Sequence, residues 1–287
     1  MSTRARLRAL LAAGSCVFPA SVHDPLSARA AGDLGFEMAM LAGSVASLAV
    51  LGAPDLALLT LSELAGLVHR ISRAADLPLF VDGDHGYGNA LNVRRTVEEL
   101  ESAGASGLSI EDTALPAGFG ATATRFIPRA EGVGKIRAAL AARRDPALVI
   151  AARTGAITAL GLSETRDRAR AYAEAGADAL FLTGIATWDA LEAIAGAVSL
   201  PLILGTLPPA LDDPARLAAH RVRIALQGHT PFQAGFAATV ATLRALRAGA
   251  KPATLGRAED AALLREVARE PEYQAAMAEY LTKIEEK

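Results

Sequence analysis

The chain repeats one pattern eight times: a short apolar run ends in polar or glycine residues, and an amphipathic segment rich in alanine, leucine and arginine follows. The apolar runs occupy residues 16–21, 36–43, 77–84, 106–112, 147–154, 177–184, 200–206 and 221–228. Each run is too short for a helix and lacks regular polar alternation, which is typical of parallel strands buried on both faces. Helical patterns fill the intervals between the runs, including 61–75, 91–103, 129–143, 163–175 and 187–197. The repeat therefore predicts an α/β fold with a parallel sheet.

Eight strand–helix units in 287 residues predict a (β/α)₈ barrel of the TIM type, with a doubly wound sheet as the alternative. We assign residues 1–248 to the barrel catalytic domain and 249–287 to a C-terminal helical extension of the same domain. The last barrel helix is expected at 229–247, and a hinge rich in glycine, proline and lysine (249–256) separates it from a charged helical tail at 258–287. This tail exceeds what barrel closure needs, so we expect it to pack on the barrel or on a neighbouring subunit.

The composition limits the possible partners of the chain. It contains 29 Lys and Arg against 31 Asp and Glu, and no basic stripe with interleaved aromatic residues, so a nucleic-acid partner has little support. No stretch approaches the length of a membrane span, and the short apolar run behind the N-terminal arginines is interpreted as a first amphipathic helix. Cys16 is the only cysteine, which excludes an intrachain disulfide and a cysteine-based zinc site. We expect a cytoplasmic protein with no membrane partner.

Polar residues gather where the predicted strands end, which is where barrels of this kind place their active sites. The residues are Ser44 after the second run, Asp82 and Asp84 in the third, Glu111 and Asp112 in the fourth, Arg153 and Thr154 in the fifth, Thr206 in the seventh and His229 after the eighth. Asp112 and Thr154 are interpreted as caps of helices or loops. The remaining residues predict a polar site at the barrel mouth.

The acidic residues of this set have two interpretations. Side chains two apart in a strand share a face, so Asp82 and Asp84 are expected to point the same way, and Glu111 to join them from the adjacent strand. With Arg153 they form either a structural ion-pair network or a site for a hard divalent cation. Mg²⁺ prefers oxygen ligands, keeps several waters and often takes only one or two carboxylates directly, which suits this set. The histidines are too few and too scattered for a zinc site.

Two histidines lie close to strand ends. His85 follows the aspartate pair, and it is either functional or a hydrogen-bonding residue of the loop. His229 follows the eighth run and begins a helix, so it either exchanges a proton, binds an anionic group or caps the helix.

These residues occur in motifs of a known family. The stretch "DGDHGYGNALNVRRTVEELESAGASGLSIED" (82–112) resembles the D-x-D-x-G-Y-G…I-E-D signature of the isocitrate lyase/phosphoenolpyruvate mutase superfamily. "AGSVAS" (42–47) resembles its carboxylate-binding loop, "GVGKIRAAL" (132–140) its helix after the gating loop, and "AART" (151–154) its substrate-binding arginine. The resemblance runs from about residue 15 to the end of the barrel. Among the branches, "SVHDPLSARAAGDLGFE", "DHGYGNALN" and "GHTPF" are most similar to the oxaloacetate decarboxylases.

The resemblance implies Mg²⁺, or Mn²⁺, bound directly by Asp82, with Asp84, Glu111 and Asp55 acting through metal-bound waters. It also implies that Ser44 and nearby backbone N–H groups hold the C1 carboxylate of a small 2-oxo dicarboxylate. Arg153 would bind a carboxylate or the keto oxygen, and His229 would meet the distal end of the substrate and mark the decarboxylase branch.

The implied reaction is decarboxylation of oxaloacetate to pyruvate and CO₂ through a metal-stabilised enolate. The implied assembly is a homotetramer, a dimer of dimers, in which the last barrel helix is exchanged between paired subunits.

Departures from the family pattern leave alternatives open. Leu207 stands where the decarboxylases carry a tyrosine, and Gly155 where the family usually has Asn or Asp. The gating loop 115–128 lacks the cysteine of the lyase branch and the lysine and asparagine of the phosphonate mutases, which argues against both reactions. The alternatives are another enolate-forming C–C or P–C bond lyase, hydrolase or mutase acting on a 2-oxo or 2-hydroxy acid, and a barrel that binds a dicarboxylate without turnover.

Overall fold

The structure, a computed structural model, describes residues 1–281 and contains one sheet of eight parallel strands in sequence order. The strands are β1 (Ala20–Ser21), β2 (Ala39–Leu41), β3 (Leu79–Asp82), β4 (Gly107–Glu111), β5 (Val149–Thr154), β6 (Ala179–Leu182), β7 (Leu202–Thr206) and β8 (Val222–Leu226). Every strand pairs with the next one along the chain. The strand order lacks the reversal of a doubly wound sheet, so that alternative is excluded.

The two ends of the sheet meet through a single residue ahead of β1. Val17 forms a parallel bridge with Ile224 of β8. Its N–H donates to the carbonyl of Arg223 at 2.8 Å, and its carbonyl accepts from the N–H of Ala225 at 3.0 Å. This seam closes the barrel, which confirms the predicted (β/α)₈ fold. The first predicted run, 16–21, therefore contributes a short strand and this separate bridge.

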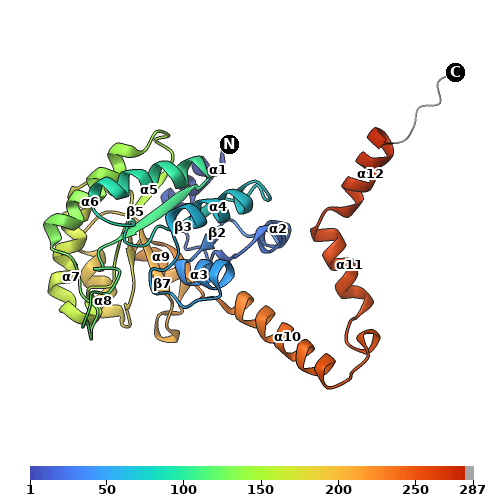
Figure 1. Ribbon diagram of the computed structural model, residues 1–287. Helices are drawn as coiled ribbons and strands as arrows, with labels where there is room; N and C mark the ends of the chain where they lie inside the picture. Colours follow the sequence, from blue (N-terminus) through green and yellow to red (C-terminus); the bar gives the residue numbers. More distant parts are fainter. Residues whose placement is uncertain (282–287) are drawn as a thin grey trace. The chain divides into compact units, whose positions relative to one another are not determined.

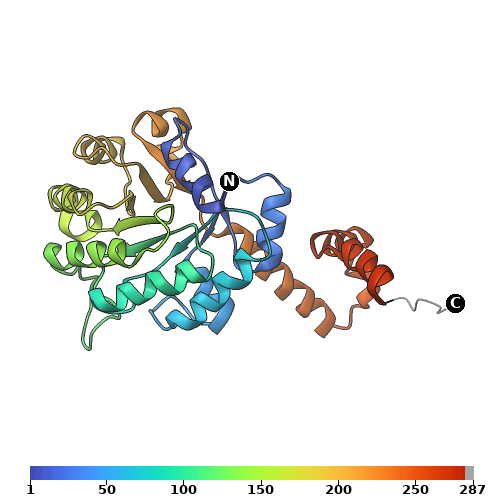
Figure 2. The same ribbon diagram turned by 90° about the horizontal axis from the view of Figure 1, so that it is seen from above.

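Helices surround the strands from outside (Figures 1 and 2). They are α1 (Thr3–Ala12), α2 (Pro25–Asp33), α3 (Gly43–Leu51), α4 (Leu61–Ser72), α5 (Ala90–Ser102), α6 (Arg129–Ala142), α7 (Ile157–Glu174), α8 (Trp188–Ala195) and α9 (Pro214–Ala219). Most lie within a few residues of the predicted ranges. α7 begins six residues before the predicted 163, because a kink at Gly161 (φ 79°) joins a short leading turn to the expected helix.

Apolar side chains fill the space between the strands and the helices, as the uninterrupted apolar runs predict. α1 precedes the barrel and contributes the fully buried Leu7. A Cβ atom on Gly107, at the start of β4, would lie 2.8 Å from Leu7 Cδ2 and 2.9 Å from Val149 Cβ. α1 therefore packs tightly at the amino ends of the strands, opposite the end where the polar residues gather.

The chain divides into two compact units, Met1–Thr230 and Pro231–Lys287. The second unit contains nearly all of α10 (Thr230–Arg247), and α11 (Ala258–Val267) and α12 (Glu270–Leu281), none of which has a buried residue. The helical tail expected from residue 258 is confirmed as far as 281, and its last residues, 282–287, lie outside the described residues. The assignment of 1–248 to a catalytic domain and 249–287 to its extension stays a prediction. Among the described residues, no helix has both the length and the apolar character to cross a membrane.

Gly83 is expected to be indispensable for the stability of the barrel. A Cβ atom on this residue would lie 2.5 Å from the backbone carbonyl oxygen of Ser109, which a side-chain rotation cannot relieve. We expect Gly83→Ala to lower the free energy of unfolding by about 1–3 kcal/mol, as overpacking does. Gly118→Ala is the matched control, because no atom lies within 4 Å of its added Cβ. Urea unfolding of both variants provides the measurement, and equal midpoints would contradict the expectation.

Candidate active site

The carboxyl ends of β3, β4 and β5 bring Asp82, Glu111 and Arg153 together. Arg153 Nη1 donates to Asp82 Oδ2 at 2.5 Å, and Arg153 Nε lies 3.3 Å from Glu111 Oε2. Glu111 and Arg153 are register partners in adjacent strands, which places their side chains side by side. The guanidinium also lies 5.2 Å from the centroid of the Phe181 ring, on β6. One arginine thus stands between two buried carboxylates.

Asp84 reaches the same cluster by a route that strand alternation does not describe. The backbone leaves β3 after Asp82, and Asp84 adopts a left-handed conformation with φ 48°, which is rare for a residue with a side chain. The expectation that Asp82 and Asp84 alternate along one strand was therefore wrong, because β3 ends at Asp82. Their side chains nevertheless converge, because the turn bends Asp84 back: its N–H donates to Asp82 Oδ1 at 3.2 Å.

Three consecutive carbonyl groups fix this turn, each through a donor from a different element. The carbonyl of Asp84 accepts from the N–H of Glu111 in β4 at 2.8 Å. The carbonyl of His85 accepts from Lys135 Nζ in α6 at 2.8 Å, and that of Gly86 accepts from Thr96 Oγ1 in α5 at 3.0 Å. A strained conformation persists where its surroundings over-determine it, and such positions are enriched at functional sites.

The two aspartates face the first turn of α3. The N–H of Gly43 points at Asp82 Oδ2 at 3.4 Å. A Cβ atom on Gly43 would lie 2.9 Å from Asp84 Oδ1 and 3.5 Å from Asp82 Oδ2, so oxygen atoms of both carboxylates border one small space. Ser44 follows in the same turn, where the backbone N–H groups of a helix start attract anions.

The charges of this cluster do not balance. Burial, together with repulsion from Asp82, Asp55 and Glu111, raises the pKa of Asp84 to about 8, although Arg153 opposes the shift. Burial also raises the pKa of Glu111, although Arg153 opposes this effect. The buried carboxylates therefore lack a cation, which is the condition that a bound metal ion relieves.

The residues present fit Mg²⁺ or Mn²⁺ better than a metal that requires a complete protein cage. Among residues 1–281, no group of three His, Cys, Asp or Glu side chains has the geometry of a preformed metal site. Mg²⁺ keeps several waters and often uses only one or two carboxylates directly, so Asp82 as a direct ligand, with Asp84 acting through a metal-bound water, would suffice. The neighbouring Glu111 would bind metal waters.

Asp55 approaches the cluster from the loop after α3. Neighbouring protein displaces part of the water around its carboxyl and raises its pKa, although the residue stays partly exposed. Asp82 raises this pKa further, and Arg153 and His229 lower it, so Asp55 is electrostatically coupled to the site. Its exposure suits contact through water better than direct ligation.

His229 lies between two serine hydroxyl groups. Its Nδ1 is 3.1 Å from Ser21 Oγ, and its Nε2 is 3.3 Å from Ser44 Oγ. Burial lowers the pKa of His229, whereas Asp82 and Asp55 oppose this shift. The ring thus lies beside the residue expected to hold the C1 carboxylate, and it belongs to the candidate site whether or not it also caps α10.

Of the two residues interpreted as caps, Thr154 and Asp112, only Thr154 has that role. Thr154 caps a turn as expected, because its hydroxyl accepts from the N–H of Ala156 at 3.2 Å. The interpretation of Asp112 as a cap was wrong: its Oδ2 accepts from Arg168 Nη1 at 2.9 Å and from the Tyr172 hydroxyl at 2.7 Å. A buried carboxylate needs such partners, and both come from α7, some 60 residues later in the chain.

The structure accounts for one of the two departures from the family motif, that at Gly155. A Cβ atom on Gly155 would lie 2.6 Å from Thr183 Oγ1, so Thr183 occupies the space that a larger side chain would need. Leu207 is partly buried against the apolar core and supplies no polar group to the site.

Ser21, Ser109 and Lys135 belong to the site but were not identified from the sequence. Ser109 Oγ donates to Asp82 Oδ1 at 3.3 Å. Ser21 ends the first apolar run, so the rule that located the other polar residues applied to it as well. Lys135 lies on the same buried face of α6 as Gly132, Ile136 and Ala139. A single charged residue on such a face was the signal that could have identified it.

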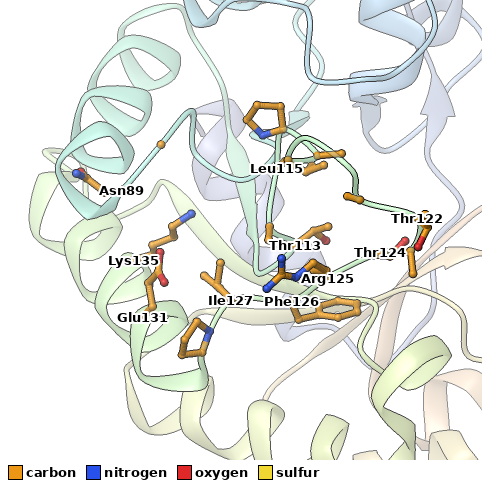
Figure 3. A pocket seen from close by; sticks show the side chains of 18 residues that line it. Asn89, Thr113, Leu115, Thr122, Thr124, Arg125, Phe126, Ile127, Glu131 and Lys135 are labelled. Carbon is orange, nitrogen blue, oxygen red and sulfur yellow. The ribbon is translucent and has the colours of Figure 1, made fainter.

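A cavity of about 780 Å³ lies beside the carboxylate cluster rather than within it. The loop 113–128 forms one wall, and Asn89, Glu131 and Lys135 form the other (Figure 3). An antiparallel bridge between Thr113 and Phe126 joins the two ends of this loop. Lys135 therefore contacts both the turn that carries Asp84 and the space under the loop.

The geometry defines a class of protein: a (β/α)₈ barrel that gathers carboxylates, an arginine and a histidine at the carboxyl ends of its strands, where barrel enzymes have their active sites. Residues 7–247 match the family model described as phosphoenolpyruvate phosphomutase. The chain therefore belongs to the phosphoenolpyruvate phosphomutase family, within the PEP mutase/isocitrate lyase superfamily, and the prediction from the motifs is confirmed.

Similar proteins cover nearly the whole chain. An oxaloacetate decarboxylase of Bradyrhizobium sp. is 54% identical over 284 residues, covering 98% of this chain and 99% of the relative. An oxaloacetate decarboxylase of Rhodopseudomonas palustris is 57% identical, covering 93% and 92%. Among solved structures, a phosphonopyruvate hydrolase has a TM-score of 0.86 at 32% identity, covering 98% of this chain and all of that one. An oxaloacetate acetylhydrolase has a TM-score of 0.85 at 29% identity, covering 98% of each chain.

Asp84 is expected to make the stability of the metal-free protein depend on pH. Its folded-state pKa, about 8, lies above the ordinary value of 3.8, so between these values the folded protein keeps a proton that the unfolded chain has released. The free energy of unfolding should therefore fall as the pH rises from about 4 to about 8.

Asp84→Asn should flatten this slope and reduce the stabilisation that added Mg²⁺ gives above about pH 7. Denaturant unfolding in EDTA across this range provides the measurement, with the exposed Asp76→Asn as the control. Identical slopes for the wild type and Asp84→Asn would rule out the assigned shift.

Proposed function

We propose that this protein is a carboxy-lyase that converts oxaloacetate to pyruvate and CO₂ with the help of a divalent cation, Mg²⁺ or Mn²⁺. The relatives named oxaloacetate decarboxylase, 52–58% identical over most of the chain, support this reaction. The observation in the structure that carries the proposal is the cation-deficient cluster of Asp82, Asp84 and Glu111 beside Arg153. A phosphonopyruvate hydrolase at 32% identity has been solved with oxalate and Mg²⁺, which supports the choice of metal.

The reaction needs an electron sink and a proton donor but no nucleophile. The C3–C4 bond of oxaloacetate breaks, its electron pair moves toward the C2 carbonyl to give an enolate, CO₂ leaves, and a proton adds to C3. When bound, the cation supplies Lewis-acid stabilisation of the negative charge at C1 and C2. The protein must then orient both carboxylates and keep bulk water from the reacting atoms.

The residues at the barrel mouth divide this task. Ser44 and the N–H groups of the first turn of α3 bind the C1 carboxylate. Arg153, held by Asp82 and Glu111, presents positive charge where the enolate oxygen develops. His229 lies next to Ser44, which binds the C1 carboxylate, so its proposed role is to protonate the enolate rather than to orient the departing C4 carboxylate.

Other enolate-forming reactions of the superfamily have less support in this chain. The solved hydrolases and the 2,3-dimethylmalate lyase are 27–32% identical, well below the decarboxylases. Cys16, the only thiol, lies ahead of β1 rather than at its carboxyl end, and burial raises its pKa to about 11. A thiol acid of the lyase type therefore has no candidate here. The 52–58% identity to proteins named oxaloacetate decarboxylase favours turnover over a barrel that only binds a dicarboxylate.

Asp82→Ala is expected to reduce pyruvate release from oxaloacetate to the rate without enzyme, because it removes the direct metal ligand and frees Arg153. Asp84→Ala and Glu111→Ala should cost about 10–100-fold, as partners that act through metal waters do. A coupled pyruvate assay with Mg²⁺ or EDTA provides the measurement. Asp76→Ala, an exposed carboxylate paired with Arg6, is the matched control. EDTA-insensitive turnover by Asp82→Ala would refute the metal-dependent mechanism.

The protein is expected to form a homotetramer, a dimer of dimers that exchanges the helix after β8, and to be located in the cytoplasm. Exposed apolar side chains on the second unit support the assembly, because isolated surfaces of this kind are unfavourable in water. They are Phe236, Leu243, Leu246, Leu263, Leu264, Tyr273, Met277, Tyr280 and Leu281. Light scattering at micromolar concentration should give about four times the 29.6 kDa chain mass. A strictly monomeric mass would contradict the proposed assembly.

A further inference from the structure

The His229 ring is held by hydroxyl groups on both of its nitrogen atoms. Ser21, the last residue of β1, contacts Nδ1 at 3.1 Å, and Ser44, in the first turn of α3, contacts Nε2 at 3.3 Å. Strand β8 meets the segment ahead of β1 at the Val17–Ile224 bridge, so His229 and Ser21 follow neighbouring parts of the barrel wall. Ser44 belongs to the turn expected to bind the substrate carboxylate, whereas Ser21 contacts the other nitrogen of the ring.

This arrangement determines which nitrogen carries the proton. A neutral imidazole has one N–H donor and one acceptor, while a hydroxyl group can donate one hydrogen bond and accept others. When Ser44 donates its proton to a substrate carboxylate, its oxygen is left to accept from the ring, so Nε2 must carry the hydrogen. Nδ1 then carries no hydrogen, so it must accept a hydrogen bond from the hydroxyl group of Ser21.

We propose that Ser21 is a positioning residue, which fixes His229 in the Nε2–H tautomer and directs that proton toward Ser44 in the first turn of α3. The inference rests on the proposed decarboxylase function for its role in turnover, but not for its effect on the ring. Ser21 contributes to the barrel through its backbone, which pairs with Met40 of β2. The hydroxyl group of Ser21 takes no part in this strand pairing, and it contacts His229 Nδ1.

The test compares Ser21→Ala with Ser21→Thr, which keeps a hydroxyl group, and with His229→Gln. Ser106→Ala is the matched control, because Ser106 Oγ is a fully buried acceptor at the opposite end of the barrel, 3.3 Å from the N–H of Leu79. We expect Ser21→Ala to lower kcat by at least about tenfold, a part of the roughly 10²–10⁴-fold that a general acid contributes, with little change in KM. Ser21→Thr should recover most of the rate, and Ser106→Ala should keep it.

Adding Ser21→Ala to His229→Gln should cost nothing more, because the serine acts only through the ring. Equal losses in the two backgrounds would overturn the proposal, as would a wild-type kcat in Ser21→Ala or an equal loss in Ser106→Ala.

Nitrogen NMR of the histidine rings gives a readout that does not need turnover. The His229 signals, assigned by their absence in His229→Gln, should show the Nε2–H form in the wild type with oxalate and Mg²⁺ bound, and a mixture of tautomers in Ser21→Ala. An unchanged ring spectrum in Ser21→Ala would overturn the proposal. If the wild type released no pyruvate from oxaloacetate yet the ring spectra changed as expected, the proposed function would fail and the role of Ser21 would stand.

Discussion

The ion pair between Arg153 and Asp82 is the interaction on which the rest of the site depends. Both groups are largely buried, and removing one partner from a buried pair typically costs about 3–5 kcal/mol because the other charge is left without compensation. Here the compensation is already incomplete, since Asp84 and Glu111 share the same low-dielectric region. The buried carboxylates at the barrel mouth therefore destabilise the fold when no cation is bound, and a bound cation would relieve this repulsion.

The scaffold maintains this unfavourable arrangement by fixing the backbone of the turn that carries Asp84, through one backbone donor and two buried side-chain donors. Asp84 is held in its left-handed conformation by hydrogen bonds to three successive carbonyl groups, from β4, α5 and α6. Gly43 lets the first turn of α3 approach both aspartates, where any side chain would collide. Ligands held within fractions of an ångström by rigid elements bind metals and stabilise charge better than ligands on loose loops.

The sequence predicted those features that follow from local patterns. Apolar runs of strand length and their spacing gave the barrel and its strand order, and the rule that active sites lie at strand ends located Asp82, Glu111 and Arg153. Features that depend on distant partners were missed: the pairing of Asp112 with α7, the hydrogen bond from Lys135 and the contact of Ser21 with His229. The residues alone also left both a structural ion-pair network and a metal site open. The family motifs pointed to the metal, and the uncompensated charge in the structure supports the same choice.

The seam at Val17 has a consequence for how the protein acquires its site. Ser21 and His229 are 208 residues apart in sequence and lie on the two sides of the bridge that joins β8 to the start of the barrel. The carboxylates and Arg153, by contrast, come from β3, β4 and β5, which pair with their neighbours without that bridge. An incompletely closed barrel would thus already possess the acidic cluster and attract a cation, yet its histidine would lack an oriented ring. The acidic cluster and the orientation of His229 thus depend on different parts of the barrel, and the contact across the seam brings the histidine to the cluster.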